Sequence, residues 1–290
     1  MKVSVIIATY RRDESLCRSI ASVKNQTYPD VEIIVVDDNA DPEWNAVVKN
    51  VINFFDGITY IKNEQNCGSA KTRNIGIFAA AGEYITFLDD DDEYLPERIE
   101  KQLTDMITAD ADFGITDLFL YNEKGQLIDK RIRNYIDSME TDKLMKYHIM
   151  YHITGTDTMM FKTSYLRRIG GFQGIDVGDE FYLMKEAILS KGLFVYSNHN
   201  YVKAYVHTGE SGGLSSGQKK IDGENYLYNE KRKYFYLLDK KEIRYIKMRH
   251  YAVIAFTKLR AKRWGGFVLN AFRAYFSSPI ACIQMLLKHR

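Results

Sequence analysis

Four consecutive aspartates, Asp89–Asp92, follow a short apolar run in this sequence. Adjacent carboxylates repel one another, and a hard divalent cation offsets that repulsion because Mg²⁺ and Mn²⁺ prefer carboxylate oxygens and keep other positions for water or phosphate oxygens. In an extended stretch Asp89 and Asp91 point the same way, so we expect the pair to hold one ion between the protein and a diphosphate. The alternative is helix capping, for which Asp92 precedes a helix predicted to start near Pro96.

Two further acidic pairs stand where an element ends or begins. Asp37-Asp38 follows a predicted strand. The pair either contributes to the ligand site or only stabilises an ordinary turn. Asp179-Glu180 follows Gly178 and opens a predicted helix. A carboxylate there caps the helix, and it can also be aimed into a cleft as a general base. Both interpretations of each pair remain open at this point.

Strand and helix patterns alternate over the first 120 residues. Strands alternating with helices of this length indicate right-handed βαβ units and a mostly parallel sheet with helices on both faces. Ligands of such sheets bind beyond the carboxyl ends of the strands, which is where the acidic clusters stand. The predicted strands are Val3–Ala8, Val31–Val36, Ile58–Lys62, Tyr84–Leu88 and Phe113–Tyr121, and the predicted helices are Leu16–Val23, Trp44–Phe55, Ser69–Ala81 and Leu95–Met106.

The pattern is less regular between residues 121 and 218. A hairpin is expected at Gly125, helices at 139–147, 164–169 and 180–190, and strands at 157–162, 193–197 and 201–207. The Gly- and Ser-rich stretch Thr208–Gln218 has the composition of a loop. Our hypothesis is that this stretch is a lid that excludes water from a reaction.

The composition is that of an ordinary globular protein whose charge is unevenly distributed along the chain. The chain has 290 residues, of which 46% are apolar and 27% charged, enough for one large domain or one domain with an appendage. Three cysteines without a C-x-x-C pair argue against a disulfide framework or a zinc site and fit a reducing compartment. The net charge is −11 over residues 1–230 and +13 over residues 231–290. A basic tail of this kind indicates an anionic partner.

We expect the tail, residues 231–290, to form amphipathic helices on an anionic membrane surface. The alternative is a helical subdomain packed on the acidic body or at a homodimer contact, and no nucleic-acid module is recognisable. The N-terminal apolar run is too short for a signal peptide, and the uncharged stretch Ala274–Leu287 is too short to span a bilayer. We therefore expect a cytoplasmic protein that lies peripherally on the inner face of the cell membrane. The tail residues expected at that surface are Trp264, Phe267, Leu269, Phe272, Tyr275 and Phe276, with Lys258, Arg260, Lys262, Arg263 and Arg273 supplying charge.

Five motifs follow one another along the chain: VSVIIATYRR from Val3, QTY from Gln26, VVDDN from Val35, NCGSAKTRNIG from Asn66 and GEYITFLDDDD from Gly82. In this order and at these intervals they resemble the family 2 glycosyltransferases of the GT-A fold. The resemblance is close over about residues 3–100, thins out by about residue 210, and is absent from the tail. It implies a GT-A type α/β fold over residues 1–218, with a nucleotide-binding half (1–120), an acceptor-binding half (121–218) and a helical C-terminal extension (219–290).

The resemblance also implies an activity and a set of site residues. The activity is inverting transfer of a sugar from a nucleotide-diphosphate sugar, with a UDP-sugar favoured, to a hydroxyl of a glycan or lipid-linked acceptor in surface polysaccharide synthesis. Mn²⁺ or Mg²⁺ is the implied cofactor. By resemblance, nucleotide contacts fall to Thr9, Tyr10, Arg11, Asp38, Arg73 and Asp90, metal contacts to Asp89, Asp91 and His207, and the catalytic base to Asp179, with Glu180 as the second choice.

This sequence departs from the family at the base, because relatives carry Glu-Asp where it has Asp-Glu, which leaves the alignment ambiguous by one residue. Among rival classes, a dinucleotide-dependent oxidoreductase is excluded because no G-x-G-x-x-G follows the first strand. A sugar-phosphate nucleotidyltransferase shares the general layout and is one alternative, although no Gly-rich phosphate loop follows Val3–Ala8. A non-catalytic homologue that binds nucleotide or glycan is the other alternative, and the intact Asp89, Asp91 and Asp179 argue against it.

Overall fold

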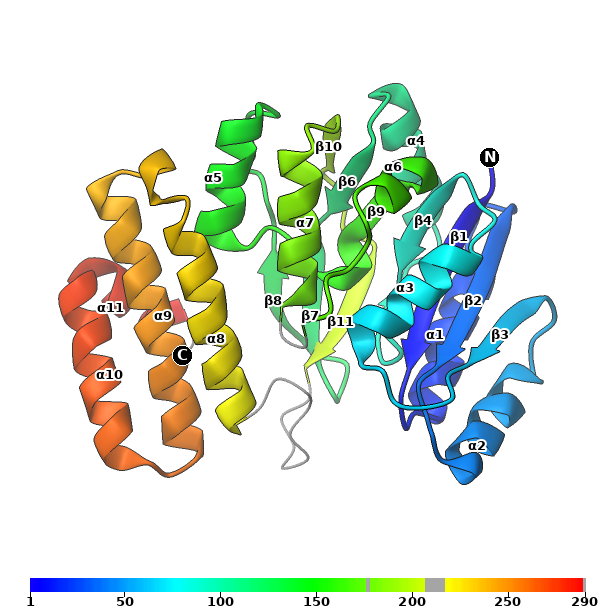
Figure 1. The fold of residues 1–290 in the computed structure, drawn as a ribbon, viewed down its shortest axis with the longest axis horizontal. Coiled ribbons are helices and arrows are strands. Elements are labelled where there is room, and N and C mark those ends of the chain that lie inside the picture. The colour runs from blue at the N-terminus through cyan, green and yellow to red at the C-terminus, as the bar shows by residue number, and fades with distance from the viewer. Residues whose placement is uncertain (176–177, 207–216, 289–290) are drawn as a thin grey trace. The chain divides into compact units, whose positions relative to one another are not determined.

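The computed structural model describes residues 1–175, 178–206 and 217–288, and it has a seven-stranded sheet at its centre (Figure 1). The strand order is β10-β6-β9-β4-β1-β2-β3. All neighbours are parallel except β9, which runs antiparallel to both β4 and β6. The predicted mostly parallel sheet is therefore confirmed. The strands are β1 Val3–Thr9, β2 Val31–Asp37, β3 Ile58–Lys62, β4 Tyr84–Phe87, β6 Phe113–Thr116, β9 Met159–Lys162 and β10 Phe194–Ser197.

Helices cover both faces of this sheet because its strands are apolar on both sides. Val3, Val5 and Ile7 of β1 pack in one buried cluster with residues of α1, α2 and α4. Ile6 points to the other face, where Gly76 of α3 approaches so closely that a Cβ at this glycine would lie 2.5 Å from Ile6 Cγ2. The helices of this part are α1 Glu14–Lys24, α2 Pro42–Ile52, α3 Ser69–Ala79, α4 Arg98–Thr108, α6 Thr163–Arg168 and α7 Asp179–Leu189.

A second sheet, in the order β5-β11-β7-β8, was not predicted. The single strand expected over Phe113–Tyr121 is wrong, because the chain leaves the main sheet at Asp117 and continues as β7 in the second sheet. Asp117 is buried, and its Oδ1 accepts hydrogen bonds from the Arg133 amide (3.0 Å) and the Tyr196 hydroxyl (2.7 Å), which fix the break. The strands are β5 Glu93–Tyr94, β7 Leu118–Asn122, β8 Leu127–Arg131 and β11 Val202–Val206.

The strand expected over Asp157–Lys162 begins two residues later, at Met159, because Thr156–Thr158 forms a 3₁₀ turn, η1. The antiparallel register of β9 with β4 pairs Met160 with Thr86. Continuing that register by three residues brings Asp157 opposite Asp89. Residues far apart in the sequence thus meet beyond the end of β4.

A separate compact unit contains most of α5, drawn in green in Figure 1, and the C-terminal helices, drawn from yellow to red. Met248 and Ala252 of α9 are buried with Ala274 of α10 and Cys282 of α11. Among the described residues, no helix has both the length and the hydropathy needed to cross a bilayer. The elements are α5 Thr141–Tyr151, α8 Gly217–Arg232, η2 Phe235–Leu237, α9 Lys240–Arg260, α10 Trp264–Ser277 and α11 Pro279–Lys288.

Candidate active site

The carboxyl ends of three neighbouring strands bring the predicted acidic residues to one rim of the main sheet. Thr9 at the end of β1 pairs in register with Asp37 at the end of β2. β4 runs parallel to β1 on its other side, and Asp89 comes two residues after β4 ends. This is the rim at which open α/β sheets bind their ligands.

Arg73 of α3 connects two of the predicted acidic residues at this rim. Its Nη1 lies 2.7 Å from Asp179 Oδ2, and its Nη2 lies 2.7 Å from Asp89 Oδ1. The guanidinium also lies over the Phe172 ring, 5.3 Å from its centroid. Burial lowers the pKa of Arg73, but Asp89 and Asp179 raise it by more, so the net pKa lies above its usual value. The guanidinium is therefore a fixed positive charge with a carboxylate on each side.

Asp179 is the first residue of α7, where Gly178 adopts a φ of +78°. The Asp179 carboxylate accepts hydrogen bonds from the Glu180 amide (2.9 Å) and from the Ser69 hydroxyl (3.3 Å), so it caps its own helix as well as pairing with Arg73. Burial is the largest influence on the pKa of Asp179 and raises it to about 7 despite the nearby Arg73. A buried carboxyl with a pKa near 7 is well matched to proton transfer at neutral pH.

Asp90 and Asp91 occupy the middle of a turn, and the extended conformation expected for Asp89–Asp92 is wrong. The Asp92 amide donates to the Asp89 carbonyl at 3.2 Å and closes the turn. The loop after β1 contacts this turn, since the Tyr10 amide donates a hydrogen bond to Asp90 Oδ2 (3.1 Å). Burial and the charge of Asp91 raise the pKa of Asp90 to about 7.

Arg12 reaches the same turn, although it was not among the predicted site residues. Its Nη2 lies 2.8 Å from Asp91 Oδ2, and its Nε lies 3.4 Å from Asp90 Oδ1. The preceding residue, Arg11, has a φ of +53° and donates its amide to Asn39 Oδ1 (3.0 Å). The loop backbone is thereby held at both acidic clusters of the rim.

Asp89, Asp92 and Asp157 form a second group of carboxylates, with one oxygen from each lying within 4.8 Å of the others. Asp157 Oδ1 accepts the Asp89 amide at 2.7 Å. Burial, followed by the charge of its acidic neighbour, raises the pKa of Asp157 to about 7 and that of Asp92 above its usual range. Three converging oxygen donors are the chemistry that a hard divalent cation prefers. The capping role considered for Asp92 is wrong, because its Oδ1 accepts the Tyr205 amide (2.8 Å) and α4 has Glu97 at its N-cap position.

Asp38 is buried where β2 meets the loop before α3. Its carboxylate accepts the amides of Cys67 (2.8 Å) and Gly68 (2.9 Å) and the side-chain amide of Asn63 (2.8 Å). Thr9 is buried nearby in the sheet, whereas Tyr10 is exposed. The remaining predicted residue, His207, and most of the predicted loop Thr208–Gln218 lie outside the described residues; Gly217 and Gln218 begin α8.

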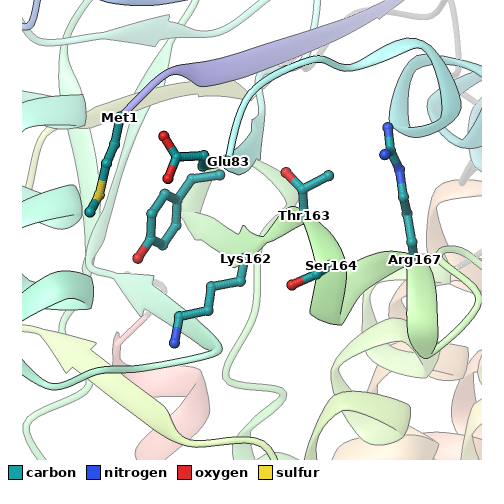
Figure 2. Close-up of a pocket in the computed structure, with 7 residues that line it drawn as sticks. Met1, Glu83, Lys162, Thr163, Ser164 and Arg167 are labelled. Carbon is teal, nitrogen blue, oxygen red and sulfur yellow. The ribbon is translucent and has the colours of Figure 1, made fainter.

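A shallow pocket lies at the opposite end of the main sheet, where β4 begins (Figure 2). Glu83, Lys162 and Arg167 are among its lining residues. Because β4 starts at Tyr84 and ends before Asp89, this pocket is separated from the acidic rim by the length of the strand. It is therefore not part of the candidate site.

Residues 4–168 match the family model "Glycosyl transferase family 2". An uncharacterized glycosyltransferase of Methanocaldococcus jannaschii, MJ1057, is 34% identical over 58% of each chain. The GalNAc(5)-diNAcBac-PP-undecaprenol beta-1,3-glucosyltransferase of Campylobacter jejuni is 43% identical over 32% of this chain and 31% of its own. The matches thus span less than two thirds of these relatives.

Solved structures of S. aureus TarS, residues 1–349, have a similar fold. The structure of that fragment has a TM-score of 0.62 at 16% identity, over 95% of this chain and 91% of the other, and TarS has also been solved with UDP-GlcNAc. The expected fold is confirmed by this likeness. Since the family model matches more than half of its residues, the chain belongs to glycosyl transferase family 2.

Proposed function

We propose that this chain catalyses inverting transfer of a sugar from a nucleotide-diphosphate sugar to a hydroxyl of a glycan or lipid-linked acceptor in surface polysaccharide synthesis. One observation carries the proposal: Arg73 holds the Asp179 carboxylate on one nitrogen and the Asp89 carboxylate on the other, both at 2.7 Å. A candidate base and a candidate metal ligand therefore share one site. A UDP-sugar is the favoured donor because TarS, which has a similar fold, was solved with UDP-GlcNAc.

In this proposal Asp179 is the general base. It takes the proton of the acceptor hydroxyl while the hydroxyl oxygen bonds to the anomeric carbon and the bond from that carbon to the diphosphate oxygen breaks on the opposite face. Its buried setting supports the role, because a pKa of about 7 leaves a carboxylate that is both available and basic enough at neutral pH. Glu180, the next residue of α7, remains the second choice.

The carboxylates beyond β4 are the proposed metal site. Asp89 and Asp91, as predicted, and Asp92 and Asp157, from their position, would hold Mn²⁺ or Mg²⁺. When bound, such an ion neutralises the charge that develops on the departing diphosphate. His207 stays in the proposal by resemblance alone.

The nucleotide would lie along the ends of β1 and β2. Asp38, Thr9 at the end of β1 and the loop residues Tyr10 and Arg11 border that region. The Tyr10 amide also donates a hydrogen bond to Asp90 there. Arg73 was predicted to contact the nucleotide, and its two carboxylate partners now favour a positioning role.

The division into residues 1–218 and 219–290 also belongs to the proposal, as does a cytoplasmic location with the tail on the inner face of the membrane. The undecaprenol-linked acceptor in the name of the C. jejuni relative supports a membrane-bound acceptor for this chain.

A pair of isosteric variants tests the proposal. Asp179→Asn removes the proposed base and should lower kcat for transfer by at least about a hundredfold. Glu180→Gln, at the next position of α7, should stay within about tenfold of the unchanged enzyme. Both variants should keep their affinity for UDP with Mn²⁺, measured by calorimetry.

Two other results would change the assignment. A large loss in Glu180→Gln with an active Asp179→Asn would move the base to Glu180. If the unchanged chain binds UDP but turns over no nucleotide sugar, with or without Mn²⁺, the chain is the non-catalytic homologue considered above.

A further inference from the structure

Helices α10 and α11 bury their small side chains and expose their large apolar ones. In α10 the buried residues are Asn270 and Ala274, and in α11 Cys282 is buried. By contrast, Phe276 is 73% exposed and Trp264 63% exposed. A helix of a water-soluble protein normally turns its large apolar residues toward the core. These two helices do the opposite.

The exposed apolar side chains form one strip on each helix. In α10 they recur at intervals of three or four residues, which places them on one side of the helix. The Phe272 and Phe276 rings stack within this strip, with centroids 6.2 Å apart. The residues of the two strips are Trp264, Val268, Leu269, Phe272, Tyr275 and Phe276 in α10 and Ile280, Ile283, Leu286 and Leu287 in α11.

The charged side chains in the part of the sequence that contains these strips are all basic. Residues 243–290 contain ten Lys and Arg and no Asp or Glu. Lys262 and Arg263, directly before α10, are exposed, and so is Arg273 within it. An apolar strip edged with bases is complementary to a surface that is apolar inside and anionic outside.

We infer that the exposed strips of α10 and α11 are inserted into the interface of an anionic membrane, with both helices lying in its plane. The 14 residues of α10 span about 21 Å, short of the roughly 30 Å of a bilayer core. Exposed Trp264 and Tyr275 are side chains that favour the headgroup level. The inference rests on the proposed function only in that a lipid-linked acceptor gives this contact its purpose.

A second copy of the chain fits the exposed strips of α10 and α11 less well than an anionic membrane does. A twofold contact places the same patch on both sides of the interface. Bases that edge the patch, such as Arg263 and Arg273, would then lie on both sides of the contact, and residues 243–290 contain no Asp or Glu to offset them.

Sedimentation of the full chain with vesicles tests the inference. We expect binding to phosphatidylcholine vesicles that contain phosphatidylglycerol, weak binding to phosphatidylcholine alone, and release at high NaCl. The double variant Phe272→Ser/Phe276→Ser should bind at least about tenfold more weakly. Its control, Phe54→Ser/Phe78→Ser, removes two exposed phenylalanines outside the tail and should bind normally.

The same sedimentation assay tests the role of the basic residues beside the strips. Lys262→Gln/Arg263→Gln should weaken binding roughly thirtyfold, since each base near an anionic surface contributes about fivefold. Lys240→Gln/Lys241→Gln removes the same charge at the start of α9, outside α10 and α11, and should have a smaller effect. In a Trp44→Phe background, Trp264 is the only tryptophan, and its fluorescence should shift to the blue when anionic vesicles are added.

Three results would overturn the inference. They are the absence of vesicle binding, equal binding to neutral and anionic vesicles, and a dimer in light scattering that Phe272→Ser/Phe276→Ser dissociates while vesicles have no effect. Donor turnover in vesicle-free solution tests the proposed function separately, so either idea can fail alone.

Discussion

Arg73 Nη1 lies 2.7 Å from Asp179 Oδ2, and this contact joins the middle of α3 to the first turn of α7 across 106 residues of sequence. The other terminal nitrogen of the same guanidinium is occupied by Asp89. The proposed base and the proposed metal ligand are therefore oriented by one planar group. Displacing either carboxylate would disturb the other.

The first prediction concerns Arg73. Arg73→Gln leaves Asp89 and Asp179 without their shared counter-charge, so it should lower the free energy of unfolding by about 3 kcal/mol. Arg73→Lys keeps the charge, but its single nitrogen cannot bind both carboxylates in the same geometry. It should therefore recover part of this stability, while the kcat of both variants should be lower than that of the unchanged enzyme. Urea unfolding and steady-state kinetics measure the two effects. Equal stability of Arg73→Gln and the unchanged chain would contradict the prediction.

The second prediction concerns pH. Burial raises the pKa of Asp90, Asp157 and Asp179 to about 7 and that of Asp92 above its usual range. The folded protein therefore binds protons that the unfolded chain has lost between about pH 4 and 7. Stability should therefore be greatest near the lower end of this window and fall as the pH rises through 7, with a limiting slope of about 1.4 kcal/mol per pH unit for each such group. Thermal unfolding between pH 5 and 8 measures the slope.

The variant Asp157→Asn tests the source of that slope. It keeps an oxygen for the Asp89 amide but removes one buried charge, so its stability should depend less steeply on pH. Asp56→Asn, at an exposed position, is the control and should leave the slope unchanged. Mn²⁺ should stabilise the unchanged chain more at pH 8 than at pH 5. A slope in Asp157→Asn equal to that of the unchanged chain would show that Asp157 does not contribute to it.

The third prediction concerns Arg12. Its guanidinium lies 2.8 Å from Asp91 Oδ2 and would compete with a divalent cation for that carboxylate. Arg12→Gln should therefore bind Mn²⁺ alone about three- to tenfold more tightly, which corresponds to a partly exposed ion pair of about 1 kcal/mol. Titration followed by electron paramagnetic resonance measures free Mn²⁺.

Arg18→Gln is the matched control for Arg12. Arg18 Nε lies 3.6 Å from Glu93 Oε1, so this variant removes an arginine from a carboxylate of the same region without touching Asp91. Equal Mn²⁺ affinity in all three proteins would show that Arg12 does not compete.

The fourth prediction concerns the packing of α3, the helix that carries Arg73. A methyl group at Gly76 would lie 2.5 Å from Ile6 Cγ2, so Gly76→Ala should cost about 1–3 kcal/mol of unfolding free energy. Adding Ile6→Ala should make the double variant more stable than the sum of the single effects. Gly265→Ala, where no atom lies within 4 Å of the added Cβ, should be neutral or mildly stabilising. Additive effects of Gly76→Ala and Ile6→Ala would rule out this contact.

Local patterns predicted the first half of the fold well because each strand and helix there has its own apolar period and its own stop signal. Ile58–Lys62 is observed as predicted, and β1, β2 and β4 differ from prediction by a single residue at the carboxyl end. The break at Asp117 could not be predicted, because it depends on Arg133 and Tyr196, which come from other segments.

The residues of the candidate site also differ in whether a local sequence pattern predicts them. Asp89 and Asp179 stand out in the sequence as a run of acids and as an acid at a helix start, and the structure brings both to Arg73. Asp157 carries no such signal, since it is a single aspartate between two threonines. It reaches Asp89 only through the antiparallel register of β9 with β4, which no local pattern encodes.

The way Asp38 is bound has a consequence for ligand affinity. Its carboxylate already fixes the amides of Cys67 and Gly68 at the entrance to α3. The conformational entropy of that junction is therefore lost once, when the chain folds, and not each time a small molecule arrives. In calorimetry, the binding of UDP with Mn²⁺ to Asp38→Asn should have a more unfavourable entropy change than its binding to the unchanged chain.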